Sequence, residues 1–80
     1  MTVVQHGARL PVYRQIADRL RAAIEAGAIP PGDRLPSEAA LVAEYDVSRG
    51  TARRVHRYLA SLGLVEVEPG RGAYVVERQP

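Results

Sequence analysis

The stretch VSRGTARRVHRYLASLG, residues 47–63, decides the fold that this sequence predicts. Its apolar residues recur at spacings of three, four and three, which indicates one buried face of a helix, formed by Ala52, Val55, Leu59 and Leu62. Ser48 offers an N-cap before this helix, and Gly63 stands where a C-terminal glycine cap is common. The stretch therefore predicts a capped helix over residues 49–62.

A shorter helix is predicted directly before it. Ser37 offers an N-cap, and Glu38 places a negative charge in the first turn, where the helix dipole favours one. Apolar residues at 41, 42 and 45 supply a short buried face before Asp46-Val47 breaks the pattern, so this helix has about eight residues. Two capped helices joined by a tight turn form a candidate helix-turn-helix.

A longer amphipathic helix is predicted ahead of this pair, from Val12 to Ala26, and Gly27 ends it. Its polar face mixes charges that pair four residues apart, which is typical of a solvated face. Residues 30–33, Pro-Pro-Gly-Asp, form a turn, and the proline at 36 holds Leu35 extended. Residues 1–11 show no clear period and are predicted to be a loose N-terminal arm.

Beyond Gly63 the hydrophobic period changes from that of a helix to that of a strand. Residues 65–68 alternate apolar and acidic, residues 69–72 are the turn Pro-Gly-Arg-Gly, and residues 73–76 form a second strand-like run. We predict an α+β fold, mostly helical: a three-helix winged helix-turn-helix over residues 12–76, whose wing is the C-terminal hairpin at 65–76. The arm, 1–11, precedes this domain, and a tail, 77–80, follows it.

Length and composition narrow the function. Eighty residues make one small domain that buries roughly 60% of its unfolded surface, so a catalytic cleft is not expected. Without cysteine there is no disulfide or thiolate site, and neither His6 nor His56 has a carboxylate at the spacing of an evident triad. We expect no enzyme, no metal and no cofactor. A start without a signal peptide and the lack of an 18-residue apolar run predict a cytoplasmic protein with no membrane contact.

The distribution of charge is more informative than the net charge of +2. A rotation of about 100° per residue places the arginines at 49, 53, 54 and 57 opposite the core face of helix 49–62. No acidic residue occurs between Ser48 and Gly63, whereas a solvated helix usually mixes signs. This face predicts double-stranded DNA as the partner, with helix 49–62 in the major groove.

The position of each arginine along helix 49–62 predicts which part of the DNA it contacts. Arg49 and Arg53 lie at its start and are predicted to contact bases, since a guanidinium can bond guanine O6 and N7 together. Arg54 and Arg57 are predicted to contact the DNA backbone. Gly50 leaves room for close approach.

Two further groups of residues are candidates for the same interface. Ser48 and Thr51 can bond phosphate through their hydroxyls, although N-capping alone explains Ser48 equally well. At the hairpin tip, Arg71 between Gly70 and Gly72 is predicted to approach a groove or a phosphate; a solvated arginine in a glycine turn is the alternative.

These residues together resemble the DNA-binding domain of the GntR family of bacterial transcription regulators. The resemblance runs from Pro11 to Val75 and rests on these segments: YRQIA at 13–17, GDRLPSE at 32–38, VSR at 47–49 followed by Thr51, Arg53 and Arg54, and GRGAYV at 70–75. It implies DNA contacts by Arg49 and Arg53, helped by Ser48, Thr51 and the glycine turn. A DNA-contacting arginine of some relatives is matched here by Ala39, so that contact is not carried over.

The resemblance also implies a repressor rather than an activator. Most relatives continue into a C-terminal domain that binds a metabolite and forms the dimer, and with Pro80 as the last residue we expect that domain to be absent. The free chain should then be monomeric, with two copies meeting on a two-fold symmetric operator.

Two other functions stay open at this point. A winged helix can dock on another regulator, which would require an acidic partner for the four arginines. An RNA-binding winged helix is the third reading, and the four tyrosines, which are not interleaved with the basic cluster, argue against it.

Overall fold

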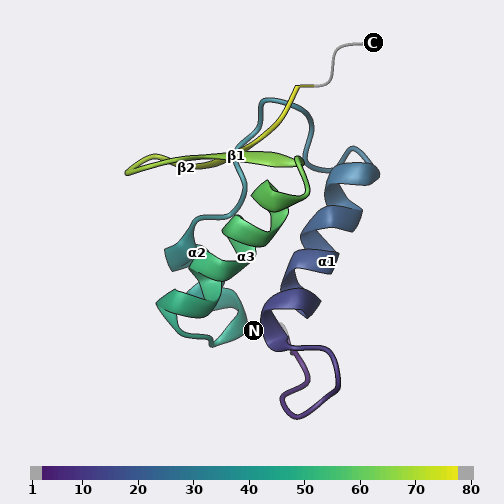
Figure 1. Ribbon diagram of the computed structural model, residues 1–80, viewed down its shortest axis with the longest axis vertical. Helices are drawn as coiled ribbons and strands as arrows, with labels where there is room; N and C mark the ends of the chain where they lie inside the picture. Colours follow the sequence, from purple (N-terminus) through teal and green to yellow (C-terminus); the bar gives the residue numbers. More distant parts are fainter. Residues whose placement is uncertain (1–2, 78–80) are drawn as a thin grey trace.

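Three helices followed by an antiparallel hairpin form the fold (Figure 1). The computed structural model describes residues 3–77. The helices are α1 (Val12–Glu25), α2 (Glu38–Tyr45) and α3 (Arg49–Ser61), and the strands are β1 (Val65–Glu68) and β2 (Gly72–Val75). The predicted winged helix-turn-helix is confirmed, with each helix within one residue of its predicted end.

The core lies where the three helices and the base of the hairpin meet. Its largest fully buried side chains come from all three helices and from the α1–α2 connection: Ile16, Leu35, Leu41, Val55 and Leu59. The prediction of Leu62 as a core residue was wrong, since this side chain is 41% exposed. Leu62 is the C-cap of α3; Gly63, at φ +75°, then turns the chain and brings Leu64 into the core instead.

The hairpin projects sideways beyond the helices (Figure 1). Its strands pair from Val65 opposite Val75 to Glu68 opposite Gly72. The base of the hairpin is buried, whereas Val67, nearer the tip, is exposed. The predicted apolar face of the hairpin is therefore buried only at its base and at Ala73, and the outer part is free to meet a partner.

Residues 32–35 pair with the free edge of β2, a contact that the sequence did not predict. Gly32 donates to the Val75 carbonyl at 2.9 Å, Val75 donates to the Asp33 carbonyl at 2.8 Å, and Leu35 donates to the Ala73 carbonyl at 2.8 Å. The connection between α1 and α2 is thereby fixed to the wing.

Residues 3–11 of the N-terminal arm are held against the domain, so the prediction of a loose arm was wrong for these residues. Val4 is buried among the core residues. The Gln15 side chain accepts from the Gln5 amide at 2.8 Å and donates to the carbonyls of Gln5 and Leu10 at 2.9 and 2.8 Å. Four hydrogen bonds, counting the one from Arg19 to the Val3 carbonyl at 2.8 Å, hold the arm to α1.

None of the helices formed by residues 3–77 has the length and apolar character needed to cross a membrane.

Candidate nucleic-acid interface

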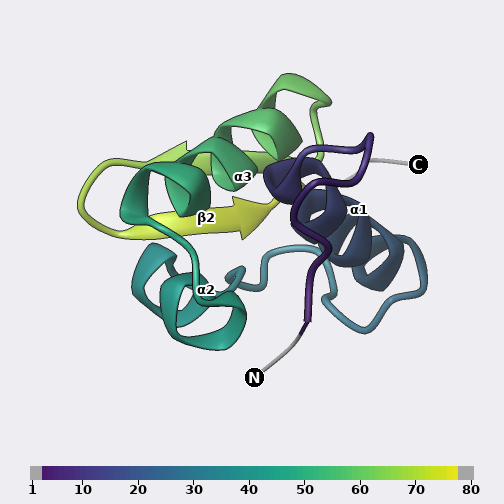
Figure 2. The ribbon, with the colours of Figure 1, turned by 90° about the horizontal axis from the view of Figure 1, so that it is seen from below.

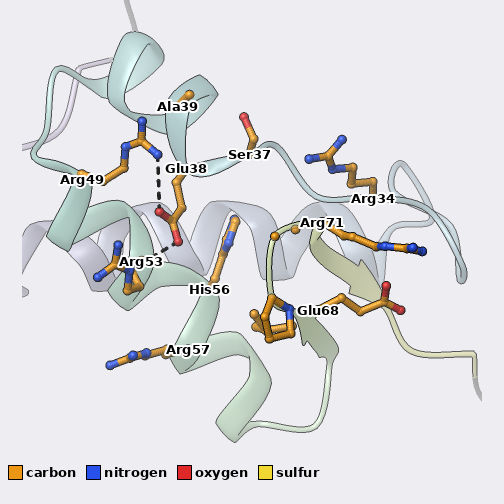
Figure 3. Close-up of a pocket in the computed structure, with 14 residues that line it drawn as sticks. Arg34, Ser37, Glu38, Ala39, Arg49, Arg53, His56, Arg57, Glu68 and Arg71 are labelled. Carbon is orange, nitrogen blue, oxygen red and sulfur yellow. Dashed lines mark ion pairs between the residues drawn. The ribbon is translucent and has the colours of Figure 1, made fainter.

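A hollow of about 530 Å³ lies between α3, the start of α2 and the turn of the hairpin (Figure 3). We call it the arginine groove, because five arginines line it: Arg34, Arg49, Arg53, Arg57 and Arg71. The carboxylates in its lining are those of Glu38 and Glu68. Five positive charges against two negative ones make the groove an attractive site for a polyanion.

Helix α3 lines this groove from Arg49 to Arg57. The Ser48 hydroxyl oxygen accepts from the Thr51 amide at 3.1 Å, and the same hydroxyl donates to the Thr51 hydroxyl oxygen at 3.1 Å. The predicted N-cap is confirmed, and it fixes the first turn of α3. Gly50, in that turn, has open space around it, with only the Ser48 hydroxyl within 4 Å of a Cβ built on it.

Glu38 pairs with two of the arginines on α3 (Figure 3). Its carboxylate lies 3.8 Å from Arg49 Nη1 and 3.6 Å from Arg53 Nε. The sequence predicted a basic face without a counter-charge, and this was wrong, because the counter-charge comes from the first residue of α2. Glu38 is 26% exposed in its side chain, whereas the two arginines are 64% and 54% exposed. Their remaining donors are therefore open to solvent.

Arg54 and Arg57 lie further along α3, and their side chains point to different surroundings. Arg57 points away from the Glu38 carboxylate along the outer side of the groove (Figure 3). Arg54 does not line the groove; its guanidinium carbon lies 4.0 Å from the centre of the Tyr13 ring. Tyr13 in turn meets Tyr58 edge to face at 5.8 Å, and Arg14 lies over Tyr58 at 4.8 Å.

This arginine–tyrosine ladder, Arg54–Tyr13–Tyr58–Arg14, joins α1 to α3 by cation–π contacts. The prediction that the tyrosines are not interleaved with the basic cluster has one exception, Tyr13, which lies under Arg54 of α3. The rings pack between two helices, and each is covered by a guanidinium, so they do not offer the exposed faces of a base-stacking platform.

His56 is buried in the floor of the interface. It is 3% exposed, and its Nε2 lies 2.8 Å from the Pro36 carbonyl oxygen. A carbonyl only accepts, so Nε2 carries the proton and donates. This bond ties α3 to the residue that precedes the N-cap of α2.

The wing turn also borders the groove, since residues 67–72 line it together with α3 and the start of α2. In Figure 2 this turn lies on the side of the molecule away from α1. Arg71 donates its backbone amide to the Glu68 carbonyl at 2.9 Å, and its side chain is exposed. Gly70 and Gly72 have φ values of +76° and +118°, which side-chain-bearing residues rarely adopt. Both glycines are thus required by the backbone of the turn.

The structure brings part of the predicted site together. Arg49, Arg53, Arg57 and the wing residues 70–72 line one groove. Ser48, Gly50 and Thr51 form the first turn of α3 beside it, and Arg54 belongs to the ladder. The sequence missed Arg34 and assigned to Glu38 only a helix-dipole role. Ala39 presents only a methyl group to the groove, so it supplies no polar contact there.

Comparison with known proteins gives the family. The model of "Bacterial regulatory proteins, gntR family" matches residues 12–75. The chain belongs to the gntR family. Among curated relatives of this gntR-family chain, the mannosyl-D-glycerate transport/metabolism system repressor MngR of Escherichia coli K12 is 48% identical over 86% of the chain. The histidine utilization repressor of Pseudomonas aeruginosa is 39% identical over 84% of the chain. The chain spans 29% and 27% of the length of these two relatives.

Solved structures of two transcription regulators share the fold over nearly the whole chain. AraR(DBD), solved in complex with operator ORE1, superposes with a TM-score of 0.87 at 31% identity, covering 95% of this chain and 99% of that one. YtrA from Sulfolobus acidocaldarius, a GntR-family transcription factor, gives a TM-score of 0.80 at 31% identity, covering 96% of this chain and 65% of that one.

Proposed function

We propose that this chain is the sequence-specific DNA-binding domain of a transcriptional repressor. Helix 49–62 enters the major groove of duplex DNA, and the wing, residues 65–76, supports it from the adjacent minor groove. The observation that carries the proposal is the arginine groove, in which arginines from α3 and from the wing face one hollow. The operator complex of AraR(DBD) and the repressor names of MngR and the histidine utilization repressor support it.

In this proposal the arginines of α3 contact different parts of the DNA. Arg49 and Arg53 lie in its first two turns and contact base edges, where the recognition helix of a helix-turn-helix reads sequence. To do so they exchange the Glu38 carboxylate for guanine O6 and N7. Arg57 contacts a phosphate. Arg54 contacts the DNA backbone. Because its guanidinium already lies over the Tyr13 ring, the side chain loses less conformational entropy when it binds.

Smaller groups complete the interface. Ser48 and Thr51 donate hydroxyl protons to a phosphate beside the N-terminus of α3, once their mutual bond is exchanged. Gly50, with open space around it, lets the DNA backbone approach. Arg71 reaches a phosphate or the minor groove from the turn formed by Gly70 and Gly72.

We further propose the arrangement of the working unit. Residues 12–76 are the DNA-binding domain, 1–11 an N-terminal arm and 77–80 a tail. The chain is monomeric in isolation, and two copies meet on a two-fold symmetric operator. It acts in the cytoplasm, on the nucleoid, without enzymatic activity, cofactor or membrane contact. Sedimentation at micromolar concentration should give the mass of one chain without DNA and of two chains on a symmetric duplex; a tight dimer without DNA would contradict this arrangement.

The test of the function is a comparison of nucleic acids. Selection from random duplexes should yield a preferred sequence, which the chain should bind at least about a thousandfold more tightly than an unrelated duplex. Affinity should fall steeply with salt on both duplexes. Single-stranded RNA of the same sequence should bind weakly. A chain that binds neither duplex but is captured by an acidic protein surface would be a docking module, and stronger binding to the RNA would indicate an RNA-binding protein.

A further inference from the structure

We propose that Arg34 is a further phosphate-binding residue, which contacts the DNA strand that runs between the major and the minor groove. The proposal rests on the DNA-binding function proposed above and adds a residue from outside α3 and the wing. Arg34 belongs to the α1–α2 connection, where the sequence pattern predicted only a turn followed by an extended segment.

The backbone places Arg34 firmly in the arginine groove. It pairs with Tyr74 of β2 in an antiparallel bridge, and its neighbours Asp33 and Leu35 are hydrogen-bonded to the same strand at 2.8 Å. Leu35 is buried in the core. Because side chains alternate along an extended segment, Arg34 points away from the core and into the groove. Figure 3 shows it between the start of α2 and the wing.

Gly72 provides the surface on which the Arg34 side chain lies. A Cβ at Gly72 would stand 2.8 Å from Arg34 Nε and 3.3 Å from its Cζ, closer than van der Waals contact allows. The guanidinium therefore rests directly against the backbone of the wing turn at Gly72. A long side chain held in this way loses less rotational freedom when it binds.

The charge of Arg34 is not neutralised by a carboxylate in residues 3–77. Arg49 and Arg53 share Glu38, whereas no carboxylate of the described segment lies within 4.0 Å of Arg34. It shares the groove with four other arginines and only two carboxylates, Glu38 and Glu68, so the net charge of its surroundings is positive. A planar guanidinium with open donors fits the paired oxygens of a phosphate.

The geometry of duplex DNA gives this charge a partner. The major and minor grooves are separated by one sugar-phosphate strand, so a protein that inserts α3 in one and the wing in the other must straddle that strand. In this chain the space between α3 and the wing is the arginine groove, and Arg34 lies in it beside Ser37. The strand that crosses from one groove of the DNA to the other therefore passes Arg34.

The test measures how binding depends on salt. The probes are a 25-base-pair duplex selected from random sequence and an unrelated duplex of equal length, titrated from 50 to 200 mM salt with the full chain. Arg34→Met keeps the apolar part of the side chain and removes the charge. It should lower the slope of log K against log salt by about 0.9 on both duplexes. Wild type should then lose about 3.5-fold more affinity than the variant over this range.

Three comparisons make the result specific. Arg34→Lys should recover most of the slope. Arg21→Ala, which removes an arginine paired with Glu25 on α1, should leave the slope unchanged. The ratio of the affinities for the two duplexes should stay constant in Arg34→Met, since a phosphate contact carries no sequence information. Thermal unfolding checks that each variant is folded.

Gly72→Ala tests the support of the side chain. It should weaken binding more in wild type than in the Arg34→Met background, and this coupling separates the loss of Arg34 placement from strain in the turn. Equal losses in both backgrounds would overturn the role of Gly72. If wild type binds both duplexes and Arg34→Met keeps the wild-type slope, the proposal for Arg34 is wrong while the DNA-binding function stands. If wild type binds neither duplex, both fail.

Discussion

Glu38→Gln most directly tests how the ion pairs of the DNA-free protein affect the arginines that bind DNA. The change removes one negative charge and keeps the size and shape of the side chain. In the structure the carboxylate lies 3.8 Å from Arg49 and 3.6 Å from Arg53. Both arginines are more than half exposed, so each pair contributes about 0.2–1 kcal/mol.

The same ion pairs oppose DNA binding, because a phosphate or a base must compete with Glu38 for each guanidinium. Releasing both arginines should strengthen binding to an unrelated duplex by about 0.4–2 kcal/mol, which is about 2- to 30-fold. At the same time the protein should become less stable, since Glu38 also lies in the first turn of α2, where a negative charge is worth about 0.3–1 kcal/mol. Together the two effects give a loss of about 0.7–3 kcal/mol, and each 1 kcal/mol lowers the melting temperature of a domain of this size by about 4–8 °C.

The assay is fluorescence anisotropy with a labelled duplex at several salt concentrations, together with thermal unfolding followed by circular dichroism. Glu25→Gln is the matched control, because it makes the same charge change in an exposed pair on α1, whose partner Arg21 is not part of the groove. The control should change duplex affinity by much less. A Glu38→Gln variant that binds the unrelated duplex as weakly as wild type, or more weakly, would refute the reasoning and show that the carboxylate places the arginines productively for binding.

Other substitutions separate the parts of the interface. Arg53→Ala should cost about 1–3 kcal/mol on the selected duplex and relax the preference at one base pair, whereas Arg57→Ala should weaken all duplexes alike and lower the salt slope by about 0.9; equal, sequence-independent losses from both would contradict this division. Arg71→Ala should lower duplex affinity at an unchanged melting temperature, and unchanged affinity would make the wing a purely structural hairpin. His56→Ala should reduce the free energy of unfolding by about 2–4 kcal/mol in denaturant titrations, because it opens a cavity in place of a buried side chain and removes the hydrogen bond to the Pro36 carbonyl; a loss below about 1 kcal/mol would show that the cavity collapses and that water replaces the bond.

The helices and the hairpin were predictable because their signals are local. The spacing of Ala52, Val55 and Leu59 fixes the buried face of α3 whatever surrounds it, and these three side chains are fully buried. Ser37 and Ser48 cap α2 and α3 through bonds to amides three residues ahead. Such short-range patterns do not depend on how the elements pack.

What the sequence did not predict depends on contacts between distant residues. Glu38 lies on α2 and reaches Arg49 and Arg53 only through the packing of the two helices, so the pattern within α3 alone indicated an unpaired basic face. His56 looks peripheral on a helical projection, yet the Pro36 carbonyl lies against it and completes its burial. The segment around Arg34 has no strand periodicity of its own, and β2 alone makes it extended and paired.

The docked N-terminal arm has a practical consequence for anyone preparing this domain. Similarity to the family begins at Val12, but folding recruits residues from further upstream, with Val4 in the core and the Gln5 backbone clamped by Gln15. A fragment that begins at Val12 would expose apolar surface of the core. The loss of Val4 alone would reduce the free energy of unfolding by about 1.5 kcal/mol. In a domain whose total stability is about 5–15 kcal/mol, that loss is a substantial fraction. The smallest portion of the chain that keeps its full stability therefore starts ahead of Val4, and an affinity tag belongs before that point.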